Sequence, residues 1–399
     1  GLAYAGVLFP ELSRAGRWRE SGLRILAAEA ERQVLSDGGS AEQTFWYLWL
    51  VTDLYGLVTA MLRHRQESVP AAIEAAAVRG RDFLNAFAEG PADIPAIGDC
   101  DNGYALSPYL CLSWDKVTRD RPGGLSMFDA SGYSLLRDKA VQASLIFDHG
   151  PLGLSPTFVH GHADALSLVL RAGHDKVLID SGTCTYSGDI RWRSYFRGTR
   201  AHNTVTVDDR DQAVQETRFM WSKPYTARLV WREEREDGQV CLLGRHDGYH
   251  DAGGVTHWRG ILFIPSLTLV VLDVITGQGE HAVELNWHLG TDASRQDDGS
   301  WMLAGTAQPV RIQINGAETR RLRADEETPA GWASPVYGTR EAACTLRSAM
   351  TTRLPFEYLT TIRIGESATS QPVSAQAGLH LWRARINEAL AYGDTRHPG

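Results

Sequence analysis

The stretch HGHADALSLVLRAGHDKVLIDSGTCTYSGDIRWRSYFRGTRAHN, residues 160–203, decides how this chain is interpreted. His160 and His162 are two positions apart, so in an extended segment both rings leave the same face. Asp180 closes one apolar run, and His202 opens the next strand-like run. Two imidazoles and a carboxylate at neighbouring strand ends are suitable ligands for a divalent metal, zinc above all. The spare histidine and the arginines around it then suggest a site for an anionic substrate.

The composition is that of an ordinary globular protein, and its 399 residues are enough for two domains. The formal net charge of −8 argues against nucleic acid or an anionic membrane surface as a bulk partner. An acidic substrate remains possible, because a local basic cleft can lie on an acidic protein.

The first part of the chain, to about residue 115, predicts helices. Apolar side chains recur at helical spacing over residues 17–35, and a third helix is predicted over 70–87. Between them, residues 45–62 are apolar almost all round and, at 18 residues, just long enough for a membrane span. Because Asp53 interrupts this run, we expect a buried inner helix rather than a membrane span.

The second part of the chain predicts short strands separated by Gly, Asp, Asn and Pro clusters. We expect strands over 133–137, 143–147, 165–170, 177–180, 204–207, 227–230, 261–264 and 268–275. Many short strands without intervening helices favour a large antiparallel β-sandwich. The predicted fold class is therefore α+β with two domains: helices over 1–115, a linker over 116–124 and a sandwich over 125–399.

Several motifs resemble the heparinase II/III-like family of polysaccharide lyases. They are HGHADALS (160–167), VLIDSGT (177–183), YFRGTRAHNTVTVD (195–208) and, in the helical part, DGGSAEQTFWY (37–47). The resemblance covers about residues 1–290. It implies that residues 1–115 are the C-terminal portion of an (α/α) toroid, followed by the β-sandwich. It also implies cleavage of uronic-acid-containing polysaccharides by β-elimination, in a cleft between the two domains.

The resemblance also implies a longer protein. The family's toroid is longer than the helical region here, and an Asn-Asn-His type motif lies upstream of the point where this chain begins. That motif supplies the group that holds the uronate carboxylate. We therefore expect the chain to be a fragment, or one piece of a cleaved enzyme, with the missing N-terminal part as a partner.

β-Elimination needs a group that neutralises the uronate carboxylate, a base for the C5 proton and an acid for the departing O4. We predict Tyr47 as base, acid or both in turn, and His160 as second base or carboxylate contact. An ordinary tyrosine has a pKa of about 10, so a competent tyrosine base would need a cationic environment.

The remaining site residues also follow from the resemblance. His162, Asp180 and His202 correspond to a metal site, probably zinc, that holds loops in place rather than performing the chemistry. Side chains near the expected cleft are predicted to bind substrate, since arginine can bind a carboxylate with two hydrogen bonds. They are Glu42, Gln43, Tyr186, Tyr195, Arg197 and Arg200.

Two other functions stay open at this point. A metal-dependent glycan hydrolase would use the His/Asp cluster to activate water, although the chain has no HExxH motif. A non-catalytic glycan-binding protein would explain a missing upstream motif. The segment GDCDNG (98–103) lacks calcium-loop spacing and is interpreted as a toroid loop that could border the cleft. Polymeric substrates favour a periplasmic or secreted location.

Overall fold

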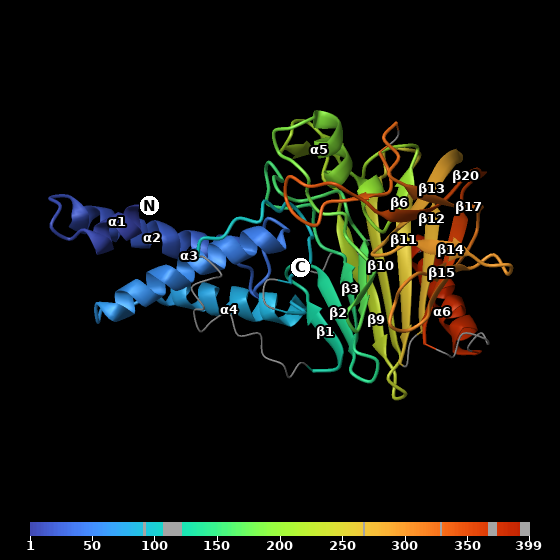
Figure 1. Cartoon of the computed structure of the whole chain (residues 1–399), viewed down its shortest axis with the longest axis horizontal. Helices are drawn as coiled ribbons and strands as arrows, with labels where there is room; N and C mark the ends of the chain where they lie inside the picture. Colours follow the sequence, from blue (N-terminus) through green and yellow to red (C-terminus); the bar gives the residue numbers. More distant parts are fainter. Residues whose placement is uncertain (91–92, 107–121, 266–267, 328, 366–372, 392–399) are drawn as a thin grey trace.

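In the computed structural model, a helical region extends from one side of a large β-structure (Figure 1). The structure describes residues 1–90, 93–106, 122–265, 268–327, 329–365 and 373–391. The helices of the N-terminal region are α1 (Leu2–Leu8), α2 (Ala15–Gln33), α3 (Phe45–His64) and α4 (Ala71–Phe87). The three helices predicted from periodicity thus form close to their expected bounds.

Helix α3 joins the two parts of the molecule. Its N-cap residue Thr44 accepts a hydrogen bond from the backbone N–H of Tyr47 at 3.5 Å. In its first turn, Phe45 packs against Phe83 and Phe87 of α4 and also against Tyr133 of the sheet, with a ring-centroid distance of 5.4 Å to Tyr133. The helical core therefore continues into the β-structure and fixes the start of α3 against it.

The length and apolar character of α3 would allow it to cross a membrane, but 56% of its most apolar window is buried inside the protein. Such burial is typical of a core helix.

The first sheet contains nine described strands. They are β1 (Gly124–Phe128), β2 (Tyr133–Asp138), β3 (Ala143–Asp148), β4 (Leu168–Ala172), β5 (Asp175–Leu178), β6 (Val205–Val207), β13 (Glu280–Leu289), β17 (Thr319–Arg323) and β20 (Cys344–Arg353). Their order is β1-β2-β3-β4-β5-β13-β20-β17, and β6 also pairs with β13.

The second sheet contains eight described strands. They are β9 (Ala227–Glu234), β10 (Val240–Tyr249), β11 (Val255–Ile264), β12 (Thr268–Thr276), β14 (Ala293–Arg295), β15 (Trp301–Leu303), β16 (Val310–Asn315) and β21 (Phe356–Ile364). Their order is β14-β15-β16-β21-β12-β11-β10-β9. Phe147, Leu242, Val271 and Trp287 belong to one buried core shared by both sheets, so the sheets form a sandwich.

Two hairpins and one helix lie outside the two main sheets. The hairpins are β7 (Val214–Gln215) with β8 (Trp221–Ser222) and β18 (Trp332–Ala333) with β19 (Glu341–Ala342). Helix α5 (Ile190–Arg197) and a short 3-10 turn (Thr199–Ala201) precede β6. Figure 1 shows α5 at the top of the β-structure, above the strands.

The outer face of the second sheet carries a helix that the sequence analysis did not predict. Helix α6 (Val373–Ala391) places Trp382 and Ile386 in a buried cluster with β10, β11 and β12. A Cβ on Gly260 would lie 2.5 Å from the Trp382 ring. The absence of a side chain at Gly260 thus makes room for Trp382.

The HGH segment differs from its expected extended conformation. Strand β4 begins only at Leu168, so residues 160–167 form a loop. His160 has φ +73°, in the left-handed region that few non-glycine residues adopt. Its ring is therefore directed by a strained local backbone and not by strand alternation, and such strain is common where a side chain has a functional role.

Candidate active site

One buried carboxylate, that of Asp99, joins the helical region to the HGH loop. Its Oδ2 lies 3.2 Å from Nδ1 of His160 and its Oδ1 lies 3.0 Å from Nε2 of His162. Both terminal nitrogens of Arg193 in α5 also donate to it, Nη2 at 2.7 Å. A single loop residue thus orients both histidines of the motif.

The charge of Asp99 decides which ring nitrogen of His160 donates a hydrogen bond. Burial works to raise the pKa of this carboxyl, but hydrogen bonds from His160, His162 and Arg193 outweigh burial and hold the pKa well below its usual range. An ionised carboxylate can only accept, so His160 donates from Nδ1, and Nε2 of the neutral tautomer carries the lone pair. The His160 side chain is 21% exposed and can meet a ligand.

Tyr47 lies directly against His160. Their rings are stacked with centroids 4.2 Å apart, and the Tyr47 hydroxyl lies 3.2 Å from the hydroxyl of Tyr186. Burial raises the pKa of Tyr47 to about 12, and the hydrogen bond with Tyr186 offsets only part of this effect. Tyr47 is therefore a phenol at neutral pH, suited to donate a proton. The structure brings Tyr47, His160 and Tyr186 together, as the sequence predicted for one site.

The other predicted substrate-binding residues are placed differently. Glu42 is half-buried and interacts electrostatically with His160. Gln43 is buried, and its amide donates to the carbonyl of Ser131, which ties the helical region to the sandwich. Tyr195 lies in α5 and is buried in an aromatic cluster with Trp192 and Phe196.

Arg197 and Arg200 have their guanidinium groups engaged within the protein. Arg197 is fully buried and donates to the carbonyls of Thr217 and Phe219, at 2.9 and 2.8 Å. Arg200 donates to Glu284 at 3.1 Å and also pairs with Asp209. Substrate contact by Gln43, Tyr195, Arg197 and Arg200 stays a sequence prediction that these positions do not favour.

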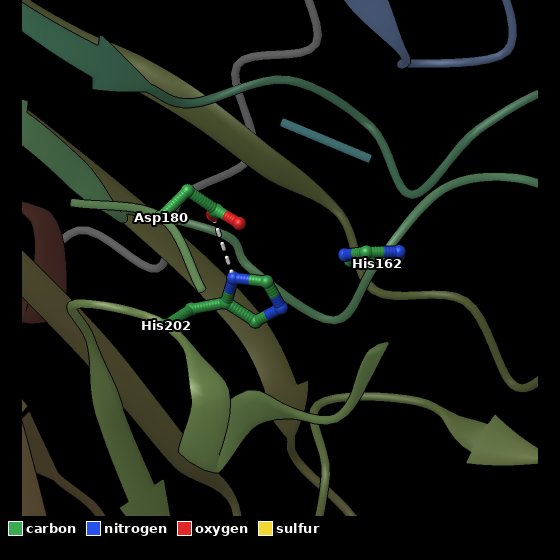
Figure 2. A group of neighbouring side chains, drawn as sticks. All are labelled: His162, Asp180 and His202. Atoms are coloured by element: carbon green, nitrogen blue, oxygen red, sulfur yellow. Dashed lines mark hydrogen bonds and ion pairs between the residues drawn. The ribbon is translucent and has the colours of Figure 1, made fainter. Parts of the chain in front are cut away.

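His162, Asp180 and His202 converge from three segments, as Figure 2 shows. Each offers one ligand atom, and these atoms lie within 4.8 Å of one another. Nδ1 of His202 lies 2.8 Å from Oδ2 of Asp180. The other nitrogen of His202, Nε2, and Nδ1 of His162 are buried and have no hydrogen-bond partner in the described part of the chain.

Two orphaned buried nitrogens beside a carboxylate fit the donor set of a zinc-type cation. His162 also contacts a carboxylate outside the ligand set, that of Asp99, through its second nitrogen. This is the arrangement that fixes a metal-ligating imidazole. All three side chains are almost completely shielded from solvent, at 0%, 3% and 0% exposure for His162, Asp180 and His202. A closed site of this kind suits a structural ion.

A buried arginine holds together the two loops that carry His162 and His202. Arg259 of β11 pairs with Asp273 of β12 at 2.6 Å. Its Nη1 donates to the carbonyl of Leu166, at 2.6 Å, and to that of Asn203. His257 completes this network at 2.8 Å from Asp273.

A cavity of about 530 Å³ lies on the other side of Asp180. Its lining includes Trp46, Asp180, Thr183 and Tyr337, but neither Tyr47 nor His160.

Comparison with known proteins agrees with this architecture. Residues 120–370 match the family described as "Heparinase II/III-like, C-terminal", and residues 1–100 match "Heparinase II/III N-terminus".

The chain belongs to the heparinase II/III-like family.

Curated relatives in this family include proteins named heparin-sulfate lyase. The one from Bacteroides stercoris is 23% identical over 379 residues, which is 85% of this chain and 52% of the relative. The one from Pedobacter heparinus is 22% identical over 318 residues, 73% of this chain and 45% of the relative. The chain spans about half the length of the curated relatives it matches.

Solved structures of heparinase II/III-like proteins share the fold. A crystal structure of heparinase III superimposes with a TM-score of 0.76 at 18% identity, covering 93% of this chain and 61% of that one. A heparan sulfate lyase from Pedobacter heparinus gives a TM-score of 0.72 at 18% identity, covering 92% of this chain and 59% of that one.

Within this heparinase II/III-like site, the sequence analysis missed Asp99, Arg193 and Phe219. Asp99 lies in the GDCDNG segment, which was expected to border the site but was given no role. The Phe219 ring lies 6.1 Å from that of His160 and 5.5 Å from that of Tyr186. No local sequence pattern could have connected these residues, since each acts through partners far away in the chain.

Proposed function

We propose that this chain acts in a polysaccharide lyase that cleaves a uronic-acid-containing glycan by β-elimination. The observation that carries the proposal is the stacked pair of Tyr47 and His160, with Nδ1 of His160 held by Asp99. Membership of the heparinase II/III-like family and relatives named heparin-sulfate lyase support it.

The two side chains have complementary proton-transfer properties. Nε2 of His160 takes the C5 proton, the electrons of the C5–H bond form the C4–C5 double bond, and the C4–O4 bond breaks. The Tyr47 hydroxyl donates its proton to the departing O4, because its raised pKa keeps it protonated beforehand. After turnover His160 holds the C5 proton and Tyr47 is a phenolate, so transfer of that proton from His160 to Tyr47 through solvent restores both groups.

The charge on the uronate carboxylate must also be neutralised for C5 to become acidic. The resemblance assigns this task in part to the Asn-Asn-His type motif of the longer toroid. We propose that the substrate is a heparan-type glycosaminoglycan, in line with the names of the relatives. A periplasmic or secreted location would match a polymeric substrate of this kind.

The metal site has a supporting role in this proposal. A zinc ion held by His162, Asp180 and His202 would neutralise the charge of Asp180 and fasten the HGH loop to β5 and β6. The shielding of these ligands argues against a hydrolase, in which the metal would need a position open to water and substrate.

The test of the lyase proposal is ultraviolet absorbance during incubation with a panel of uronate polysaccharides. Elimination creates a double bond conjugated to the carboxylate, which absorbs, whereas hydrolysis creates only new reducing ends. Absorbance that rises with one polymer identifies a lyase and its substrate class. New reducing ends without absorbance would instead identify a hydrolase. The assay needs this chain and a version extended upstream, and a response from the extended version alone would assign the carboxylate contact to the upstream part.

A further inference from the structure

The tip of the β7–β8 hairpin forms one wall beside Tyr47 and His160. Arg218 and Phe219 lie in the turn between the two short strands. The Phe219 ring contacts those of His160 and Tyr186. Arg218 donates from Nη1 to the carbonyl of Gly188 at 2.8 Å and to that of Tyr186 at 3.4 Å. The Arg218 side chain is therefore anchored to the residue whose hydroxyl contacts Tyr47.

Two buried arginines of α5 make this wall rigid. Three successive carbonyls, of residues 217, 218 and 219, accept hydrogen bonds from the guanidinium groups of Arg193 and Arg197, at 2.8–2.9 Å. The indole of Trp221 lies under the Arg197 guanidinium and donates to the carbonyl of Gly161 at 2.9 Å. The hairpin tip, α5 and the HGH loop are thus held together, which leaves little freedom for the position of Arg218.

Arg218 differs from the other arginines of this region in its unused donors. Arg193 is saturated by Asp99 and a carbonyl, and Arg200 is paired with two carboxylates. In the part of the chain that the structure describes, Arg218 contacts only two carbonyls, both through Nη1, and has no ion-pair partner. It is half-buried rather than fully covered. Its Nε and Nη2 edge therefore remains free to bind an anion with two hydrogen bonds.

We propose that Arg218 binds an anionic group of the polysaccharide, a uronate carboxylate or a sulfate, and so holds the sugar against Tyr47 and His160. This inference rests on the proposed function, because it assigns the substrate to this site. It replaces the expectation that Arg197 or Arg200 makes that contact. Arg218 acts as a binding and specificity residue, and proton transfer stays with Tyr47 and His160.

The test compares Arg218→Gln and Arg218→Lys with the unaltered chain, in the upstream-extended version if only that version is active. Glutamine retains a donor for the Gly188 carbonyl but removes the charge. Lysine retains the charge but cannot offer the paired Nε and Nη2 donors of a guanidinium group. Arg295→Ala is the matched charge control, since Arg295 is exposed at the remote end of the second sheet. The probes are heparan sulfate and its chemically desulfated counterpart. For each of the two polymers, the KM of elimination is measured with the Arg218 variants. The Kd is measured by calorimetry with the same variants combined with Tyr47→Phe, which prevents turnover.

Arg218→Gln is expected to raise KM and Kd roughly ten- to a hundredfold, the range for loss of a hydrogen bond to a charged group. Arg218→Lys should recover part of this loss, and Arg295→Ala should change neither quantity. An equal loss on both polymers identifies the uronate carboxylate as the bound group, and a loss confined to heparan sulfate identifies a sulfate.

Unchanged KM and Kd on both polymers in Arg218→Gln would overturn the inference while leaving the lyase proposal intact. If binding is present but no absorbance appears, the lyase proposal fails and the affinities alone still decide the role of Arg218. If the unaltered protein binds neither polymer, both proposals are overturned.

Discussion

Two hydrogen bonds join Asp99 to His160. The backbone N–H of Asp99 donates to the carbonyl oxygen of His160 at 2.9 Å, and the Asp99 carboxylate lies 3.2 Å from Nδ1 of the His160 ring. The first bond fixes the strained backbone of His160, and the second fixes its tautomer. A loop of the helical region thus positions the His160 ring, which stacks on Tyr47.

Replacing Asp99 with Asn should therefore cost both activity and stability. We expect kcat to fall by roughly 10²–10⁴, as when the carboxylate that orients a catalytic histidine is replaced by an amide. The buried Arg193 would lose its charged partner, which destabilises a protein by about 3–5 kcal/mol. The measurements are the absorbance rate well below the melting temperature and Tm itself. Asp101→Asn in the same loop is the control, and a normal rate in Asp99→Asn would refute the tautomer argument.

The Tyr47→Phe variant should keep its fold and lose elimination. The substitution removes only the hydroxyl, so we expect kcat to fall by about 10²–10⁴, the usual worth of a positioned general acid. The control is Tyr55→Phe on the same helix, whose hydroxyl donates to Gln33 at 2.9 Å and lies in the helical core. Near-normal turnover by Tyr47→Phe would remove this residue from the mechanism.

Replacing His202 with Ala should lower metal content and Tm together. The variant removes one of the three side chains that we propose as ligands, and an ion bound there would tie together the loops around β5 and β6. A chelator should lower Tm of the unaltered protein and have little further effect on the variant. His281→Ala removes another imidazole that pairs with a carboxylate, Asp208, and should leave metal content unchanged. Elemental analysis checks this, and full occupancy in His202→Ala would exclude His202 as a ligand.

Stability should decline as pH falls below 6.5, in part because of His149. Burial lowers the pKa of His149 from 6.5 to about 4, so the folded state keeps this ring neutral. Between pH 6.5 and 4 the unfolded chain binds the proton more readily, and the free energy of unfolding decreases by up to about 3 kcal/mol. Above pH 6.5 His149 is neutral in both the folded and the unfolded state, so it no longer makes the free energy of unfolding depend on pH. Denaturant unfolding of His149→Gln should show a shallower pH slope. An unchanged slope would show that other groups cause the loss.

Periodicity and local motifs were enough for much of the fold. The apolar stripe over residues 17–35 predicted α2, and alternating short runs predicted β2, β3 and β12. Helix α6 was missed. Its central contact packs Trp382 against Gly260, a residue without a side chain in a strand far away in the sequence.

The grouping of His162, Asp180 and His202 was also predictable, because the resemblance assigned all three to one site and Asp180 and His202 border neighbouring apolar runs. The pairing of the arginines with other groups could not be predicted. Sequence alone could not show that Arg197 is covered, that Arg200 is neutralised by Glu284, or that Arg218 keeps free donors. These differences depend on partners 20 to 84 residues away along the chain.

The contacts around Gly161 bear on the order in which the protein folds. A Cβ at this position would lie 1.6 Å from the carbonyl oxygen of Leu152, and its own carbonyl accepts from Trp221, 60 residues later. Asp99 must reach the same loop from 61 residues earlier in the chain. Contacts of such sequence separation form late, because each closes a long loop. During refolding, enzymatic activity should therefore return after the secondary structure, and it should disappear first on heating.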